Sequence, residues 1–180
     1  MPTEGTTITT MAELMTKLFE SGMVYALMGA SVAVILSGIG SCLGIRMPAQ
    51  TSAGAMSEDP SNFGKYLILV ALPGTQGIYG FVAAFLVITK LQLTDPTAAK
   101  NIADSITTAQ GLQIFFACLP IAVAGLISAI YQGKVCTAGV ELTAKQPTES
   151  GKALVLGVFV EFYAVLGLIV TIFLLTGIQL

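Results

Sequence analysis

The sequence predicts an all-α membrane protein with four transmembrane helices arranged as two tandem helical hairpins. Three observations support this fold: an apolar composition, four long segments almost free of charge, and an internal repeat with a constant offset. Hydrophobic residues make up 54% of the chain and charged residues 10%, whereas an ordinary soluble domain has about 25% charged residues. The mean hydropathy is +0.85. Most of the surface must therefore face lipid or other membrane helices.

Charged residues delimit the four spans. Segments 21–45, 66–89 and 105–133 carry no charge, and segment 153–180 carries a single charged residue, Glu161. Each segment exceeds the ~20 residues that a helix needs to cross the hydrocarbon core. Helices of a soluble bundle would each show a polar stripe, and none of these does. We expect transmembrane helices at about residues 21–45, 64–90, 108–134 and 152–178.

The connections between the spans predict the orientation in the membrane. The first and third connections hold five basic residues, and the middle connection and the N-terminal segment together hold three. The positive-inside bias places the turns near Pro60 and Pro147 in the cytoplasm and both termini on the outer side.

Composition also excludes several classes of ligand. The net charge of −2 argues against a nucleic-acid partner, and the absence of histidine removes the commonest metal ligand. No G-x4-GK[ST] motif is present, so we expect no nucleotide, and we expect neither haem nor a transition metal. The three cysteines show no close pairing pattern and are expected to pack as small apolar side chains.

The chain aligns with itself without a gap at an offset of 87 residues. Two hairpins with the same orientation follow, because a repeat of two spans cannot invert. The first hairpin covers 21–93, the linker 94–107 and the second hairpin 108–180, with residues 1–20 outside the repeat. Chance similarity of apolar segments does not explain a Pro-x3-Gly-Lys match in both polar loops. The matches include Gly38 with Gly125, Ser41 with Ser128, Pro60 with Pro147, Gly64-Lys65 with Gly151-Lys152, and Gly80 with Gly167.

Small residues recur every three or four positions in the first and third spans, which lets helix backbones approach closely. Two explanations remain open. The stripes either pack within one bundle or line a tight inner ring of an oligomer, with the second and fourth spans outside.

Glu161 is the candidate functional residue. It lies roughly 13 Å along the helix from Lys152, which is near the middle of the membrane. A carboxylate there costs about 2.5–3.5 kcal/mol on insertion scales, so its presence indicates a function. Its repeat partner is Gly74, so only the second hairpin carries this carboxylate. The alternative is a protonated Glu161 that only holds helices together through a hydrogen bond.

Neutral oxygen donors are expected at the same depth. Residues equidistant from a hairpin turn share a depth, which puts Gln132 level with Glu161 and extends its helix past Lys134. In the second span, Thr75 and Gln76 supply side-chain oxygens at this level.

The same part of the second span departs from regular helix. Pro73 interrupts the hydrogen-bond ladder and Gly74 adds flexibility, so a nearby backbone carbonyl can turn towards an ion. Tyr79 lies one turn beyond Thr75 and can hydrogen-bond the carboxylate. One carboxylate with several neutral oxygens suits a monovalent hard cation, whereas calcium usually takes more carboxylates and magnesium keeps several waters. A proton needs fewer donors.

Three stretches carry a family resemblance: LPGTQGIYGF at 72–81, YQGKV at 131–135 and VEFYAVLG at 160–167. Through them the chain resembles the K subunit (the proteolipid, or duplicated c-type subunit) of V/A-type rotary ATPases, and among these the sodium-transporting bacterial members. The resemblance implies a non-catalytic ion-translocating protein that forms a ring of identical copies in the plasma membrane of a prokaryote. It further implies contact with lipid, with a stator a/I-type subunit that has an essential arginine, and with central-stalk subunits. The implied Na+ ligands are Leu72 (backbone carbonyl), Thr75, Gln76, Gln132 and Glu161, with Tyr79 hydrogen-bonded to the carboxylate.

Three other functions compete with this prediction. The same rotor protein can carry H+ instead of Na+. A self-contained channel or secondary transporter would instead show polar residues along whole faces of several spans. A purely structural proteolipid would tolerate Glu161→Gln.

Overall fold

The computed structural model describes Thr16 and residues 19–180. Most of the segment expected outside the repeat, 1–20, therefore lies outside the described residues. In the described part, the first hairpin consists of α2 (Gly22–Glu58), α3 (Phe63–Ala71) and α4 (Thr75–Lys90). The second consists of α6 (Thr108–Lys145) and α7 (Ser150–Gly177). Short 3-10 turns form the two hairpin tips, η1 (Pro60–Asn62) and η3 (Pro147–Glu149).

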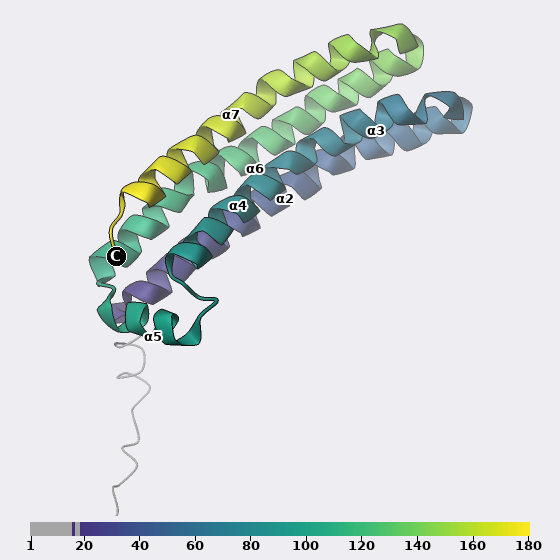
Figure 1. Cartoon of the computed structure of the whole chain (residues 1–180). Helices are drawn as coiled ribbons and strands as arrows, with labels where there is room; N and C mark the ends of the chain where they lie inside the picture. The colour runs from purple at the N-terminus through teal and green to yellow at the C-terminus, as the bar shows by residue number, and fades with distance from the viewer. Residues whose placement is uncertain (1–15, 17–18) are drawn as a thin grey trace, which may run out of the picture.

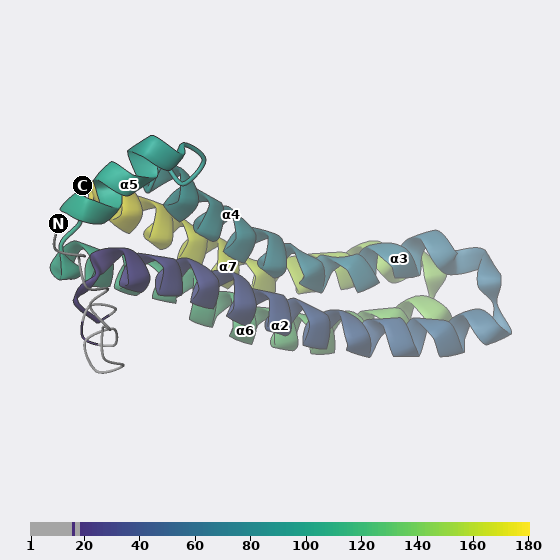
Figure 2. The same cartoon turned by 90° about the horizontal axis from the view of Figure 1, so that it is seen from below.

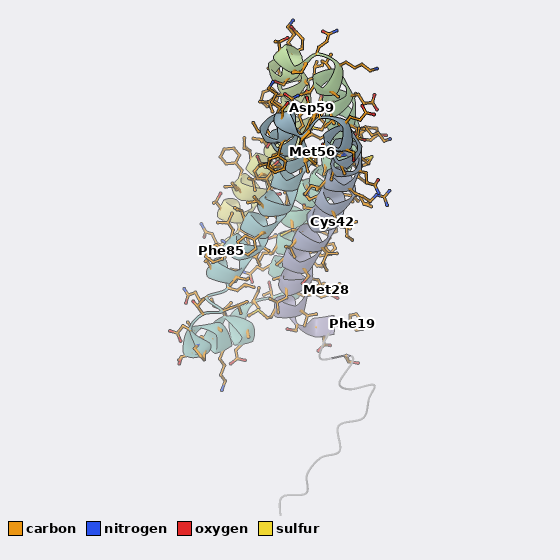
Figure 3. All side chains as sticks on the ribbon, turned by 90° about the vertical axis from the view of Figure 1, so that its right-hand side faces the viewer. Phe19, Met28, Cys42, Met56, Asp59 and Phe85 are labelled. Atoms are coloured by element: carbon orange, nitrogen blue, oxygen red, sulfur yellow. The ribbon has the colours of Figure 1, made fainter. Side chains whose placement is uncertain are left out.

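The two hairpins lie side by side and bow in the same direction, with both tips at one end of the molecule (Figure 1). The view from below shows the same elongated bundle, with α5 at the end opposite the tips (Figure 2). Asp59 marks the tip of the first hairpin, and Phe19 lies at the far end (Figure 3). Four segments of the described chain are long and apolar enough to cross a membrane: Gly22–Glu58, Pro60–Lys90, Thr108–Lys145 and Pro147–Gly177. The predicted fold of four helical spans is confirmed.

Two helices run well beyond the spans expected from the charges. α2 continues to Glu58, beyond the span that ends near residue 45. α6 continues to Lys145, beyond the charge-delimited span, and this confirms the extension past Lys134 that the hairpin register predicts. Arg46 and Lys134 therefore lie inside helices. A charged residue marks where a helix leaves the hydrocarbon, not where it ends, because the backbone hydrogen bonds continue without lipid.

The linker 94–107 contains a short helix that was not predicted, α5 (Pro96–Ser105). The carboxylate of Asp95 accepts a hydrogen bond from the backbone N–H of Thr97 at 2.9 Å, and Pro96 occupies the first turn. An aspartate N-cap followed by proline is a typical helix start.

Pro73 divides the second span. The helix is replaced over Leu72–Gly74 by the 3-10 turn η2, which separates α3 from α4. The N–H of Gly77 donates to Ser41 Oγ of α2 at 2.8 Å. The side chain of Ser41 thus compensates for the hydrogen bond that the irregular turn disturbs.

Small residues bring α2 and α6 together, so the two hairpins of one chain touch through their first helices. A methyl group on Gly40 would lie 2.7 Å from Leu126 Cα, and one on Gly29 would lie 2.7 Å from Phe115 Cα. Ser37 Oγ donates to the carbonyl of Ile121 at 3.2 Å across the same contact. Close backbone approach of this kind is the usual role of small residues between membrane helices.

The register of the second hairpin agrees with the prediction. A methyl group on Gly157 would lie 3.2 Å from Cys136 Sγ, and one on Gly139 would lie 3.0 Å from Ala153 Cβ. For residues of α6 and α7 that face one another, the two residue numbers thus have a nearly constant sum, as expected for an antiparallel hairpin. This register puts Gln132 and Glu161 at the same depth.

The ends of the two hairpins opposite the tips are joined by hydrogen bonds. Lys90 Nζ donates to the carbonyl of Ile178 at 2.6 Å, and Thr108 Oγ1 donates to the carbonyl of Glu20 at 2.6 Å. Both contacts link the first half of the chain to the second half at the same end of the bundle.

The described cysteines are free thiols: Cys42 is exposed, and Cys118 and Cys136 are buried. The two buried thiols lie among apolar side chains, Cys118 with Ile114 and Ile121, and Cys136 with Val140. They pack as small apolar residues, as the sequence predicts.

Candidate ion-binding site

The predicted donor residues come together between the two hairpins. Leu72, Thr75 and Gln76 lie on η2 and the start of α4, which belong to the first hairpin. Gln132 on α6 and Glu161 on α7 face them from the second hairpin. The site therefore exists only where the two repeats of the chain meet.

Two buried glutamines connect the hairpins through a directed chain of hydrogen bonds. Gln132 Nε2 donates to the carbonyl of Gly157 at 3.1 Å, and Gln76 Nε2 donates to Gln132 Oε1 at 2.6 Å. Because a backbone carbonyl can only accept, Gly157 fixes the orientation of both amides. The oxygen of Gln76 is thereby turned towards Thr75.

Three neutral oxygens gather at Thr75. Its hydroxyl oxygen lies 3.0 Å from the carbonyl oxygen of Leu72 and 3.3 Å from Gln76 Oε1. A hydroxyl has one proton, so it cannot donate to both acceptors at once. One of the two contacts is then between oxygens with no proton between them, an arrangement that a bound cation stabilises. Pro73 and the 3-10 turn position the Leu72 carbonyl for this contact.

Glu161 lies beside this group and binds the tyrosine. Tyr79 OH donates to Glu161 Oε1 at 2.6 Å. Among the described residues, Glu161 hydrogen-bonds Tyr79 and not Gln76 or Gln132. The carboxylate is partly exposed, and its neighbours Phe162 and Tyr163 are exposed on the outer face of α7.

Two residues of this region were not predicted. Gly157 accepts from Gln132, and a side chain there would meet Leu72 Cδ2 at 2.8 Å. Ser41 supports the backbone after Pro73. Gly157 lies one helical turn before Glu161, a spacing that is visible in the sequence. Ser41 matches Ser128 in the repeat, but that match does not indicate that its side chain bonds the Gly77 N–H.

Glu161 carries the acidic charge of this site alone. Across residues 19–180, no cluster of three or more His, Cys, Asp or Glu side chains lies close enough to hold a metal ion. The site thus combines one carboxylate with neutral oxygens.

The family model for the C subunit of ATP synthase matches residues 28–87 and 115–174. The chain belongs to this family. The two matched ranges begin 87 residues apart and end 87 residues apart, the same offset as the repeat in the sequence. Each hairpin thus contains one copy of the family's unit.

Similar proteins within this family are subunits of V-type and A-type ATPases or ATP synthases. The chain is 41% identical over 153 residues to the V-type sodium ATPase subunit K of Enterococcus hirae, which covers 85% of this chain and 91% of the relative. It is 35% identical to the A-type ATP synthase subunit K of Methanocaldococcus jannaschii over 87% of this chain, but spans only 64% of that longer protein. Identity to the human 16 kDa proteolipid of the V-type proton ATPase is 29%, over 87% of this chain and 94% of the relative.

These relatives confirm the predicted resemblance to K subunits of V/A-type ATPases. They are all named as subunits of an ATPase or an ATP synthase. The prediction that this chain is a non-catalytic, ion-translocating membrane protein is confirmed on the same ground.

Proposed function

We propose that this chain is the rotor-ring subunit of a V/A-type ATPase and carries Na+ across the membrane at Glu161. Identical copies form the ring, with α2 and α6 on its inner side and α4 and α7 outside. ATP hydrolysis or synthesis in the soluble head is coupled to rotation of the ring. The turns near Pro60 and Pro147 face the cytoplasm, where the central-stalk subunits bind, and both termini face outwards.

The closely spaced oxygens around Thr75 are the observation that favours Na+ over H+ as the transported ion. The oxygens of Leu72 and Gln76 lie 3.0 Å and 3.3 Å from Thr75 Oγ1, respectively. A proton transfer at Glu161 needs none of them, whereas Na+ requires several oxygen ligands. Rotation of the Gln132 amide, or sharing of its second lone pair, adds a further oxygen.

Charge balance explains how such a site moves through lipid. An occupied site pairs one Na+ with one carboxylate and is close to neutral, whereas an empty site leaves a charge in the hydrocarbon. Tyr79 holds the carboxylate in place when it is charged. Release requires a competing positive charge, and the essential arginine of the stator supplies it.

Protection of Glu161 from a carbodiimide tests the ion. We expect Na+ to slow the labelling of Glu161 at mildly acidic pH, as measured by mass spectrometry of the peptide, while K+ at equal ionic strength does not. Thr75→Val should abolish this protection, and Thr89→Val on the same helix should retain it, because the Thr89 hydroxyl bonds only its own turn. An equal rate of Glu161 labelling with and without Na+ would contradict the proposal and favour H+ as the ion.

Removal of the Tyr79 hydroxyl is expected to weaken Na+ binding. A hydrogen bond to a charged group contributes about 1.5–3 kcal/mol, so Tyr79→Phe should raise the half-protecting Na+ concentration by roughly tenfold or more. Tyr25→Phe on α2, a half-buried tyrosine far from the site, is the matched control. Equal half-protecting concentrations in both variants would mean that the Tyr79 contact does not support the bound state.

A further inference from the structure

A serine on α2 supplies the cap that the start of α4 lacks. α4 begins at Thr75, and the first N–H groups of a helix have no acceptor within the helix itself. An N-cap side chain often accepts from the N–H at the third position, but the N-cap residue of α4 is Gly74, which has no side chain. Ser41 Oγ accepts from that third N–H, the one of Gly77, at 2.8 Å. Ser41 therefore caps α4 from a neighbouring helix.

The capped turn is the part of α4 that carries two of the proposed ion ligands. Thr75 and Gln76 are the first two residues of α4 and directly precede Gly77. Ser41 is 6% exposed, and a Cβ at Gly77 would lie 3.2 Å from its Oγ, so the cap is enclosed between α2 and α4. These two helices pack along each other in the first hairpin (Figure 1). Any movement of Gly77 away from α2 would displace both ligands, because all three residues belong to one helical turn.

The cap also favours the break in the second span. In an uninterrupted α-helix the Gly77 N–H would donate to the carbonyl of Pro73, four residues earlier. Because Ser41 accepts from this N–H, the helix gains less from closing over the break. The Leu72 carbonyl accepts from the N–H and the hydroxyl of Thr75 in the broken form. The cap thus stabilises the arrangement of oxygens at which the proposed ion binds.

The internal repeat provides a comparison within the same chain. Ser128 on α6 is the counterpart of Ser41 and is buried to the same degree, at 5% exposed. The counterpart of Gly77 is Ala164, which lies within the uninterrupted helix α7. The hydroxyl of Ser128 has no hydrogen-bond partner among the described residues. Of the two described hairpins, only the one whose second span is broken and carries ligands thus uses this serine as a cap.

We propose that Ser41 is a positioning residue for the ion. Its hydroxyl fixes the turn of α4 that carries Thr75 and Gln76, and in this way it sets the affinity of the site for Na+. Ser41 acts through the backbone of α4 and is not itself a ligand. This inference rests on the proposed function, because it takes Na+ as the ion.

Ser41→Ala tests the proposal, with Ser128→Ala as the matched control. Both substitutions remove a buried hydroxyl, but in this structure only the first removes a hydrogen bond to the backbone. The experiment measures carbodiimide labelling of Glu161 over a series of Na+ concentrations, in membranes that contain the full chain and its partner subunits. The loss of a helix cap changes an equilibrium by about fivefold, so Ser41→Ala should raise the half-protecting Na+ concentration by about fivefold. Ser128→Ala should leave it unchanged.

Thermal unfolding separates positioning from packing. An ion that binds only the folded protein raises the unfolding midpoint, and the size of the rise depends on the affinity. At one fixed Na+ concentration, we expect a smaller Na+-induced rise for Ser41→Ala than for the unmodified chain, and an equal rise for Ser128→Ala. A serine that only packs would lower the midpoint equally with and without Na+, and that result would overturn the proposal.

The outcomes distinguish this inference from the proposed function. The same half-protecting Na+ concentration in the unmodified chain and in Ser41→Ala would contradict only the role of Ser41. Equal weakening in Ser41→Ala and Ser128→Ala would also overturn that role, because the loss of any buried hydroxyl would then perturb the site. No Na+ protection in the unmodified chain would contradict both the role of Ser41 and the choice of ion.

Discussion

Glu161→Gln is expected to abolish Na+ transport by the assembled ATPase. The carboxylate is the acidic group of the site, and a carboxylate attracts a monovalent cation about 4 Å away by about 4 kcal/mol at the effective dielectric typical of proteins. The neutral amide loses this attraction, which corresponds to a roughly thousandfold weaker affinity. The measurement is ATP-driven 22Na+ uptake into inverted membrane vesicles.

The control for this substitution is Glu141→Gln. Glu141 is an exposed carboxylate on α6, about two and a half helical turns from Gln132 towards the tip of the second hairpin. Uptake should remain near the unmodified level in this variant. Normal uptake in Glu161→Gln would show that the carboxylate is not the ion ligand and would favour a structural role for it.

Gly44→Leu is expected to push the two hairpins apart and to destabilise the folded protein. A Cβ at this position collides with the backbone carbonyl of Ala129 and lies 2.8 Å from Pro73 Cβ. Neither neighbour can rotate away, so the substitution should cost more than about 3 kcal/mol. For a chain of this size, the midpoint of thermal unfolding should fall by about 10 °C.

Gly64→Leu is the matched control, because a Cβ at Gly64 has no atoms within 4 Å. Thermal unfolding in detergent, followed by circular dichroism, compares the two variants. Equal midpoints would show that α2 and α6 do not meet as closely in the membrane as in this structure. Since Gly44 touches Pro73, Na+ protection of Glu161 should also fail in the Gly44 variant.

The sequence predicts the spans and the hairpin register well because lipid imposes simple rules. A helix in hydrocarbon must satisfy its own backbone, so long uncharged segments can only be helices. The repeat then fixes the topology, and symmetry about the turn places Gln132 level with Glu161. These inferences need no knowledge of side-chain contacts.

The ends of the helices obey different rules, and prediction is less accurate there. The charge at Arg46 limits the predicted first span, but α2 continues to Glu58. For α6, the hairpin register predicts a helix that passes Lys134, but not that it continues to Lys145. The helix α5 depends on the cap formed by Asp95, a local interaction that hydropathy does not report.

Within the site, the sequence supplies the donors but not their hydrogen-bond directions. The carbonyl of Gly157 orients Gln132, and Gln132 in turn orients Gln76. These directions depend on which of the two glutamine side chains lies against a backbone carbonyl, and only the packing of the hairpins decides that. That Glu161 bonds Tyr79 and neither glutamine likewise appears only in three dimensions.

The hydrogen bonds that join Lys90 to Ile178 and Thr108 to Glu20 have a mechanical consequence. In the proposed rotor they oppose sliding of one hairpin along the other when a force acts on α7. The proposed ion ligands come from both hairpins, so such sliding would change the distances between them. The two hydrogen bonds therefore help to keep those distances constant while the proposed ring transmits torque.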